Sequence, residues 1–270
     1  TVKGGITEFD IMTLNPGDFP ALPNPGADQT LDIDTADLQE MVETTLYAVS
    51  TDDKKPAHTG ELFAIEPEKL TVVALDGYRL AIIEKPVKAA KEISIIIPAK
   101  TLSEVVKLFG EEDGVVHIAA NRRLVVFSNE KYTVISRLIE GEFLDYKRVI
   151  PEGFKTRVTV DVRDFVNTIE RASLIITERL KNPLRITFDG NITVRCQTTL
   201  GKVVDELPAE MEGESVEIGF NNRYLLEALR NTECDEVKVQ LGGPLSPMKV
   251  VPKEGDSFLF LVLPVRLKSE

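Results

Sequence analysis

Two pairs of basic residues have a spacing that would place both charges on one face of a helix. Lys100 and Lys107 are seven residues apart, and so are Arg223 and Arg230. Seven residues make about two helical turns, so both members of a pair would project from the same side. Side chains of this kind can contact phosphates of a nucleic acid without reading its sequence. The spacing therefore predicts a phosphate-facing surface on two helices.

Further basic residues could extend this surface. Arg163 and Arg171 are about two turns apart in another expected helix, and Lys54 and Lys55 follow the first expected helix. Solvated helix faces often carry such charges, so one pair alone indicates little. The second pair, however, repeats the first at a constant offset, and the glutamate between the two cations recurs as well. This repetition favours a shared basic surface.

The overall charge opposes that interpretation. The chain has a net charge of −12, whereas proteins that neutralise phosphates usually show an excess of basic residues. In addition, the first expected helix carries Asp37, Glu40 and Glu43. The two observations agree with nucleic-acid binding only if the positive charge is concentrated on one surface.

Residues suited to catalysis are few. His58 and His117 are the only histidines, and neither has a Cys or Glu at metal-ligand spacing. The usual nucleotide-binding, hydrolase and metalloprotease motifs are absent. The carboxylates Asp52, Asp53 and 111–113 have the pattern of charged loops. We therefore expect no enzyme activity, no metal and no cofactor; a metal-dependent hydrolase remains the enzymatic alternative.

The elements that would position the basic pairs occur twice. LDIDTADLQEMV begins at residue 31 and VTVDVRDFVNTI at residue 158, and each reads as a strand followed by a helix with an aspartate N-cap, Asp34 or Asp161. SIIIPAKTLSEVVKLFG (94–110) matches SVEIGFNNRYLLEALRN (215–231) in the same way. The offset stays between 122 and 127 residues. Each copy thus has two amphipathic helices and several short strands.

This repeat divides the chain into three parts. Residues 26–151 and 152–270 hold one copy each, which suits the usual size of a domain. Residues 1–25 belong to neither copy and resemble the end of a further copy, with a strand followed by a Pro/Gly-rich exit. The expected fold class is α+β, with two helices packed on antiparallel sheet in each copy.

The C-terminal run SFLFLVLPVRL is apolar almost to the end of the chain. Proline cannot continue a central strand, so residues 263–267 should leave the sheet as a partly exposed apolar tail, and such patches tend to bind partners. Cys196 and Cys234 are isolated, no long apolar stretch occurs, and the start lacks a secretory pattern. These features predict a cytoplasmic protein.

Several segments resemble the bacterial DNA sliding clamp, the beta subunit of DNA polymerase III, in the family's order. They are FPALP (19–23), VVALDGYRLAI (72–82), IIPAKTLSEVVKLFG (96–110), RLIEGEFLDYKRVIP (137–151), RASLI (171–175), EIGFNNRYLLEALRN (217–231), GPLSPM (243–248) and VLPVRL (262–267). The resemblance implies a tandem array of clamp domains with helices toward a DNA channel, where the two copies correspond to domains two and three. It also implies that residues 1–25 are the end of domain one, most of which is lacking.

The function implied by the resemblance is that of a non-catalytic processivity factor. Its partners would be duplex DNA, bound without sequence preference, and the polymerase III catalytic subunit, the clamp loader, repair polymerases and mismatch-repair proteins. These proteins would dock short motifs with a glutamine and apolar anchors. A protein-interaction module with no DNA role is the alternative. The DNA-facing residues would be Lys54, Lys55, Lys100, Lys107, Arg163, Arg171, Arg223 and Arg230.

The resemblance also places a peptide groove between the two copies. Its residues would be His58, Leu75, Gly77, Tyr78, Arg79, Leu80, Leu144, Arg148, Val149, Asn221, Tyr224, Leu245, Pro247, Leu261, Val262, Leu263, Pro264, Val265 and Arg266. Leu75 and Tyr78 replace the Thr and His that are usual in the family, so the pocket should be more apolar. The full-length family dimer would use Leu174 and Ile175, and we expect the present chain to be monomeric.

Overall fold

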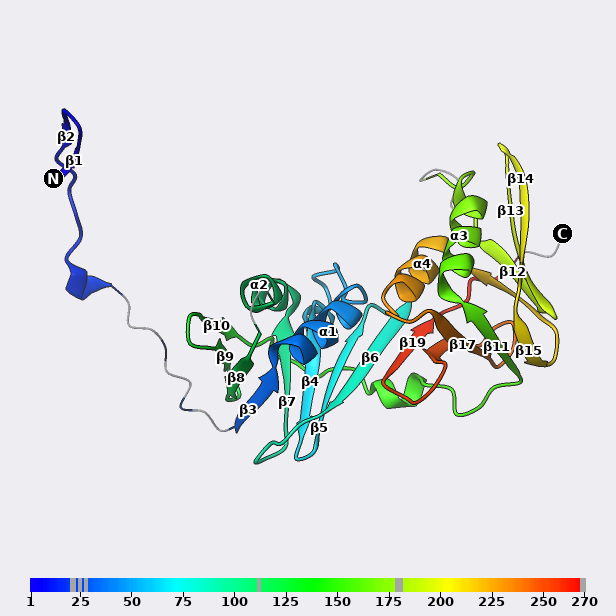
Figure 1. The fold of residues 1–270 in the computed structure, drawn as a ribbon, viewed down its shortest axis with the longest axis horizontal. Helices are drawn as coiled ribbons and strands as arrows, with labels where there is room; N and C mark the ends of the chain where they lie inside the picture. The colour runs from blue at the N-terminus through cyan, green and yellow to red at the C-terminus, as the bar shows by residue number, and fades with distance from the viewer. Residues whose placement is uncertain (20–22, 24–25, 27–28, 111–112, 178–181, 268–270) are drawn as a thin grey trace.

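The computed structural model describes residues 1–19, 23, 26, 29–110, 113–177 and 182–267. Glu111 and Glu112, which the sequence places in a charged loop, and part of segment 1–25 lie outside the described residues. The body of the molecule begins at residue 29. In the preceding segment, β1 (Val2–Gly4) and β2 (Thr7–Phe9) form an exposed hairpin, followed by the short helix η1 (Pro16–Asp18). Figure 1 shows this segment standing apart from the body.

The first copy runs through two helices and eight strands in the described part of the chain. Its elements are β3 (Gln29–Asp34), α1 (Thr35–Leu46), η2 (Pro56–His58), β4 (Gly60–Glu66), β5 (Lys69–Leu75), β6 (Arg79–Pro86), β7 (Ile93–Pro98), α2 (Ala99–Phe109), β8 (Val115–Ala120), β9 (Leu124–Ser128) and β10 (Thr133–Arg137). The segment after β10 contains η3 (Tyr146–Val149) and leads into the second copy.

The second copy repeats this order with one additional strand. Its elements are β11 (Thr156–Asp161), α3 (Val162–Ser173), β12 (Leu184–Asp189), β13 (Asn191–Thr198), β14 (Gly201–Pro208), β15 (Glu210–Gly213), β16 (Val216–Phe220), α4 (Asn222–Arg230), β17 (Glu236–Leu241), β18 (Met248–Pro252) and β19 (Phe258–Val262). The α+β fold and the strand-to-helix switches expected from the sequence are thereby confirmed.

A single sheet joins the two copies. The described residues form a nine-stranded sheet in the order β15-β11-β17-β18-β19-β6-β5-β4-β7, flanked by the four-stranded sheets β10-β9-β8-β3 and β14-β13-β12-β16. The junction is the antiparallel pair β19–β6, where Phe260 lies opposite Ala81 and Val262 opposite Arg79. Because this pairing uses backbone hydrogen bonds, it fixes the relative position of the two copies.

The helices share one side of the sheets. Figure 1 shows α1, α2, α3 and α4 along the upper side of the body, with the nine-stranded sheet beneath them. The central strands are apolar on both faces: Val72 and Ala74 of β5 face the helices, whereas Val73 and Leu75 belong to a second apolar cluster on the opposite face. The linking segment that contains Phe143 packs over this second cluster.

The two aspartates expected to cap helices differ. Asp161 precedes α3 and accepts a hydrogen bond from the backbone N–H of Asp164 at 2.8 Å. Asp34 occupies the same position before α1, but its side chain makes no cap hydrogen bond. The N-cap geometry is therefore shared by both copies, whereas the side-chain bond is found in only one of them.

The acidic character of α1 has a local explanation. Lys85 of β6 reaches the Asp37 carboxylate at 3.1 Å and the Glu40 carboxylate at 2.5 Å. One lysine of the underlying sheet thus forms ion pairs with two of the three acidic side chains of α1 and offsets part of their charge. This partner lies far away in sequence, so helix periodicity could not reveal it.

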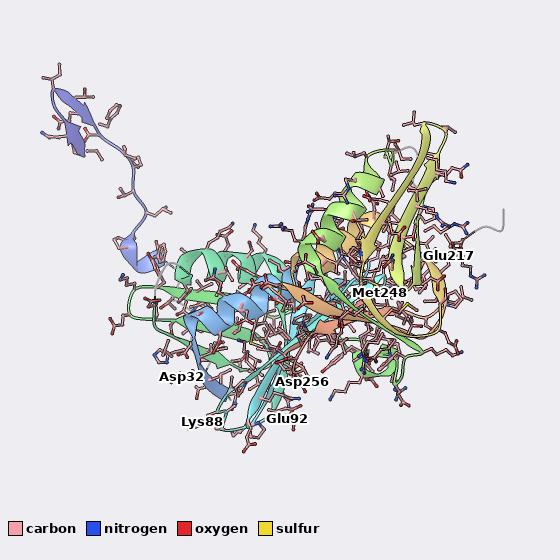
Figure 2. All side chains as sticks on the ribbon, turned by 45° about the vertical axis from the view of Figure 1, so that its right-hand side comes forward. Asp32, Lys88, Glu92, Glu217, Met248 and Asp256 are labelled. Carbon is pink, nitrogen blue, oxygen red and sulfur yellow. The ribbon has the colours of Figure 1, made fainter. Side chains whose placement is uncertain are left out.

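His117 has a structural environment, as its alternating strand predicts. It lies opposite Asp32 in the β3–β8 pair, and its Nδ1 is 2.6 Å from the Asp32 carboxylate. Figure 2 shows Asp32 at the edge of the body. Within the described residues no group of three His, Cys, Asp or Glu side chains could hold a metal ion. None of the described helices is long and apolar enough to cross a membrane.

Glu61 of β4 is fully buried, and neither carboxyl oxygen has a hydrogen-bond partner in the described structure. Burial raises the pKa of the Glu61 carboxyl well above its ordinary value. The adjacent Thr45 hydroxyl offsets only part of this effect, because it donates its own proton to the Met41 carbonyl at 2.8 Å. Glu61 is therefore neutral in the folded protein at a pH where it ionises in the unfolded chain.

The difference between the folded and the unfolded pKa of Glu61 predicts that the stability of the chain depends on pH. Glu61→Gln should remove this dependence. A carboxyl whose pKa is raised by folding stabilises the protein fully below the unfolded pKa, and this contribution declines as the pH rises toward the folded pKa. The slope is about 1.4 kcal/mol per pH unit within that window. Urea unfolding at pH 5, 6 and 7 should therefore show a growing advantage of Glu61→Gln over the unsubstituted chain. Glu66→Gln, at the partly exposed end of the same strand, is the control, and parallel curves for all three proteins would contradict the assignment.

Candidate functional site

Two tyrosines meet at the junction between the copies. Tyr78, in the turn before β6, stacks on Tyr224 of α4 with ring centroids 5.6 Å apart and planes inclined by 18°. Tyr78 remains 60% exposed, whereas Tyr224 is half-buried. The pair presents an aromatic surface that draws one ring from each copy.

Beneath this pair lies the buried cation Arg79, which is only 5% exposed. Its Nε is 3.0 Å from the Asp76 carboxylate, and its Nη1 donates to the carboxylate of Glu227 in α4. The guanidinium also lies over the Tyr47 ring at 5.3 Å and the Tyr224 ring at 4.9 Å. Ion pairs and cation–π contacts therefore connect both copies around one side chain.

Tyr47 completes the surroundings of Arg79 from the end of α1. Its ring packs edge-on against Phe260 at 5.7 Å, and its hydroxyl has no hydrogen-bond partner in the described structure. Burial raises the pKa of the Tyr47 hydroxyl, and the neighbouring Arg79 charge counteracts this rise only in part. The Tyr47 ring therefore serves as a neutral wall beside the arginine.

The turn before β6 has a fixed shape. Gly77 adopts φ 94°, a conformation that glycine tolerates without strain. The Asp76 carboxylate accepts hydrogen bonds from the backbone N–H groups of Tyr78 at 2.8 Å and Arg79 at 3.1 Å. Asp76 thus holds both the turn and the Arg79 side chain.

The C-terminal tail is attached at two points. The Leu263 N–H donates to the Tyr78 carbonyl at 2.9 Å, and the Val265 N–H donates to the Gly219 carbonyl of β16 at 2.8 Å. Gly219 makes the second contact possible, because a Cβ atom there would lie 2.5 Å from the Val265 carbonyl oxygen. The tail therefore bridges the turn of the first copy and the edge strand of the second.

The residues assigned to the groove fall into an inner and an outer set. Leu75, Leu80 and Leu261 are buried in the second apolar cluster, and Val262 is buried in the main core. The exposed apolar side chains are Leu144, Val149, Leu245, Leu263 and Val265, of which Leu245 is the most open at 67%. The buried set can serve as a floor, while the exposed set is available for contact.

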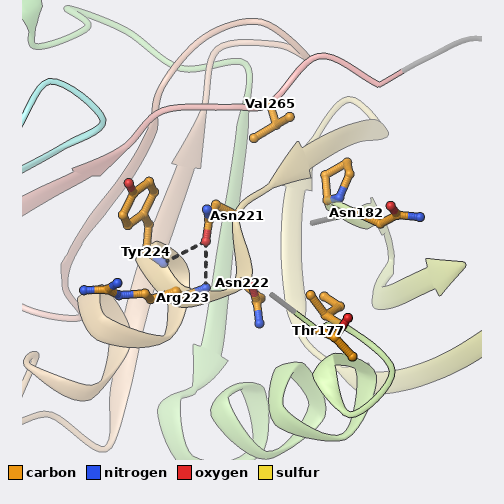
Figure 3. Close-up of a pocket in the computed structure, with 9 residues that line it drawn as sticks. Thr177, Asn182, Asn221, Asn222, Arg223, Tyr224 and Val265 are labelled. Carbon is orange, nitrogen blue, oxygen red and sulfur yellow. Dashed lines mark hydrogen bonds between the residues drawn. The ribbon is translucent and has the colours of Figure 1, made fainter. Parts of the chain in front are cut away.

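Only part of the groove set lines a defined cavity. A cavity of about 620 Å³ at the start of α4 is lined by Ile176, Thr177, Asn182, Pro183, Asn221, Asn222, Arg223, Tyr224 and Val265. Figure 3 shows Asn221 in this cavity, where its side chain accepts hydrogen bonds from the backbone of Arg223 and Tyr224. A second hollow of about 450 Å³ includes Leu144. The remaining groove residues line neither hollow.

His58 and Arg148 lie on the side of the linking segment. The His58 ring meets Phe143 edge-on at 5.8 Å, and burial, with help from Lys55, lowers the pKa of its imidazole. Arg148 is exposed and forms an ion pair with Asp145 at 2.8 Å. Pro247 and Pro264 are partly buried, and Arg266 is exposed.

Half of the eight cations assigned to the DNA-facing surface already have acidic partners. Lys107 pairs with Glu104 at 3.0 Å, and Arg223 pairs with Glu227 at 2.9 Å. Arg230 pairs with Glu170 of the neighbouring helix, and Arg171 reaches Asp205 of β14 at 2.6 Å. Lys54, Lys55, Lys100 and Arg163 are exposed and form no ion pair with the described residues.

The helices as a set carry no excess of positive charge. α2 and α4 each have two cations and one carboxylate, α3 is balanced, and α1 has three carboxylates and no cation. Any attraction for phosphate must therefore come from individual cations, the unpaired ones above all. Leu174, assigned to the dimer interface, is 80% exposed after α3, whereas Ile175 is half-buried against the core.

Sequence reasoning missed the side chains that organise this junction. Glu227 was noticed only as the repeat of Glu104, and the partners Asp76, Tyr47 and Gly219 were not assigned. For Gly219 a signal exists, since an isolated glycine inside a strand indicates close approach of another backbone. For the others, the pairing depends on the β6–β19 register, which sequence periodicity does not provide.

Two helix-and-sheet repeats, joined edge to edge with their helices on one side, define a clamp-type protein. The family models for the central and C-terminal domains of the DNA polymerase III beta subunit match residues 32–145 and 147–266. The beta sliding clamp of Staphylococcus epidermidis is 32% identical over 270 residues, covering 98% of this chain and 71% of the relative. The Staphylococcus aureus clamp gives the same identity and coverage.

Solved structures agree with these matches. The Bacillus subtilis sliding clamp superposes with a TM-score of 0.93 at 29% identity, covering 98% of this chain and 72% of the other. The Bartonella birtlesii clamp, solved bound to griselimycin, has a TM-score of 0.87 at 30% identity, covering 97% and 73%. The chain belongs to the beta sliding clamp family of DNA polymerase III, whose members are non-catalytic processivity factors.

Proposed function

We propose that this chain contributes the partner-docking and part of the DNA-lining surface of a bacterial replication clamp. Its partners are duplex DNA and DNA polymerase III, in the cytoplasm where the chromosome is replicated. The observation that carries the proposal is the junction itself, where β6–β19 pairing brings the turn at Tyr78, the helix α4 and the C-terminal tail together. Its membership of the clamp family supports this assignment.

The docking surface would consist of the exposed apolar set around the stacked tyrosines. Leu245, Leu263 and Val265 come from the second copy, and Leu144 and Val149 from the linking segment. Exposed apolar side chains with a few polar groups nearby suit a short peptide with apolar anchors. The partners that would use it are the polymerase III catalytic subunit, the clamp loader, repair polymerases and mismatch-repair proteins.

The internal repeat gives the domain boundaries. We propose residues 26–151 and 152–270 as two clamp domains, with 1–25 as the end of a preceding one. A homodimer of the full-length protein would use the exposed Leu174 beside Ile175. Light scattering tests the expectation that the present chain alone is monomeric.

The DNA-facing assignment predicts that Lys100→Gln and Arg163→Gln together weaken binding of a short linear duplex. Each phosphate contact contributes about 0.9 to the slope of log affinity against log salt, so the double variant should lose up to about 2 in that slope. Fluorescence anisotropy between 50 and 200 mM salt measures it. Lys253→Gln is the control, because Lys253 follows β18, lies outside the DNA-facing set and pairs with Glu236 at 2.5 Å. An unchanged slope in the double variant would favour an interaction module with no DNA role.

A further inference from the structure

One carboxylate is shared by two arginines, each of which binds a different oxygen of it. Glu227 Oε2 accepts from Arg79 Nη1, and Glu227 Oε1 accepts from Arg223 Nε at 2.9 Å. The Glu227 side chain is 28% exposed, Arg79 is buried and the Arg223 side chain is 71% exposed. The same carboxylate therefore contacts a buried cation of the first copy and a solvent-exposed cation of its own helix.

A series of contacts connects Arg79 to the docking surface. Arg79 binds Asp76, Asp76 holds the backbone of the turn at Tyr78, and the Tyr78 carbonyl receives the N–H of Leu263. The Arg79 guanidinium also supports the Tyr224 ring at 4.9 Å. Movement of Arg79 would thus displace both the tyrosine pair and the start of the tail.

Arg223, the other partner of Glu227, is exposed on the surface of α4. Arg223 is one of the cations assigned to DNA, and Glu227 is its acidic partner among the described residues. Figure 3 shows its side chain extending from the start of α4, away from Asn182. An exposed arginine bound to one carboxylate can exchange that carboxylate for a phosphate without disturbing the core.

We propose that Glu227 is a positioning residue that couples occupancy of the DNA-facing side to affinity at the peptide-docking surface. The proposal rests on the function proposed above. When a phosphate draws Arg223 away, Glu227 retains only Arg79, and the repulsion between the two guanidinium groups is removed. Arg79 is then held more firmly, so the turn, the tyrosine pair and the tail are better ordered before a peptide arrives. Because coupling of binding free energies is reciprocal, a bound peptide would strengthen DNA binding by the same factor.

The test is titration of the whole chain with a labelled, glutamine-led pentapeptide carrying leucine and phenylalanine anchors, with and without a saturating short DNA duplex. For the unsubstituted chain we expect the duplex to tighten peptide binding about fivefold, at the lower end of known couplings. Arg223→Gln should bind peptide about fivefold more tightly without DNA and show no further response. Glu227→Gln should bind more weakly than the unsubstituted chain, again without a response to DNA.

The internal repeat provides a matched control. Glu104→Gln changes the equivalent glutamate of α2, which pairs with Lys107 and is remote from the junction, so its peptide affinity and DNA response should match the unsubstituted chain. A DNA response that persists in Arg223→Gln, or that is absent in an unsubstituted chain binding both ligands, would overturn the coupling. Failure of the unsubstituted chain to bind peptide or duplex would instead count against the proposed function.

Discussion

Gly219→Val is expected to lower the affinity of the chain for a glutamine-led apolar peptide by about 100-fold, while both apolar cores stay folded. A Cβ atom at Gly219 would lie 2.5 Å from the Val265 carbonyl oxygen and 2.7 Å from Leu267 Cδ2. Since Val265 approaches through its backbone, the tail must move away from β16. The hydrogen bond from Val265 to Gly219 is lost with it.

The size of the effect follows from the apolar side chains that the tail presents. Leu263 and Val265 are only 39% and 38% exposed, and each is available to cover a peptide anchor. Full burial of such a side chain contributes about 1.5–3 kcal/mol. Because both side chains are already partly buried, the lower bound applies, about 3 kcal/mol for the two together, which corresponds to about two powers of ten in affinity. Truncation before Leu263 should remove the same binding altogether.

Isothermal titration calorimetry measures the peptide affinity, and circular dichroism reports the fold. Gly153→Val is the matched control, because a Cβ atom at this exposed glycine meets nothing within 4 Å. Equal peptide affinity of the Gly219 variant and the control would mean that the tail takes no part in docking. Loss of the folded signal in the Gly219 variant would mean that the tail supports the β16 sheet itself.

Arg79→Met should destabilise the chain by about 3–5 kcal/mol. The substitution removes the buried cation, which leaves the Asp76 carboxylate, 12% exposed, without its counter-charge and the Glu227 carboxylate paired with Arg223 alone. Breaking a buried ion pair by removing one partner costs about this much, because the remaining charge stays desolvated. The cation–π contacts with Tyr47 and Tyr224 are lost as well.

Urea unfolding followed by circular dichroism gives the free energy of unfolding for this comparison. Arg148→Met is the control, since Arg148 also pairs with an aspartate three residues away but its side chain is 85% exposed. An exposed pair contributes at most about 1 kcal/mol, so this variant should remain close to the unsubstituted chain. Equal stability of the two variants would show that the junction does not depend on Arg79.

Two kinds of interaction shape this protein, one between residues close in sequence and one between residues far apart. The period of apolar residues around Asp34 and Asp161 predicted two strand-to-helix repeats, and the proline at 264 predicted a tail that leaves the sheet. Both features depend on neighbouring residues, because hydrogen bonding within a helix and alternation along a strand are local. The family resemblance was visible for the same reason, since its motifs are short and continuous.

The tertiary structure alone decided which charges neutralise one another. Lys85 forms ion pairs with the acidic side chains of α1, and Glu227 binds both Arg79 and Arg223. Lys85 and α1 are far apart in the chain, and so are Arg79 and Glu227. Such partners depend on the β6–β19 register and on the packing of α1 and α4 against it. A sequence specifies that a lysine or a glutamate is present, whereas only the folded chain brings a particular pair within hydrogen-bonding distance.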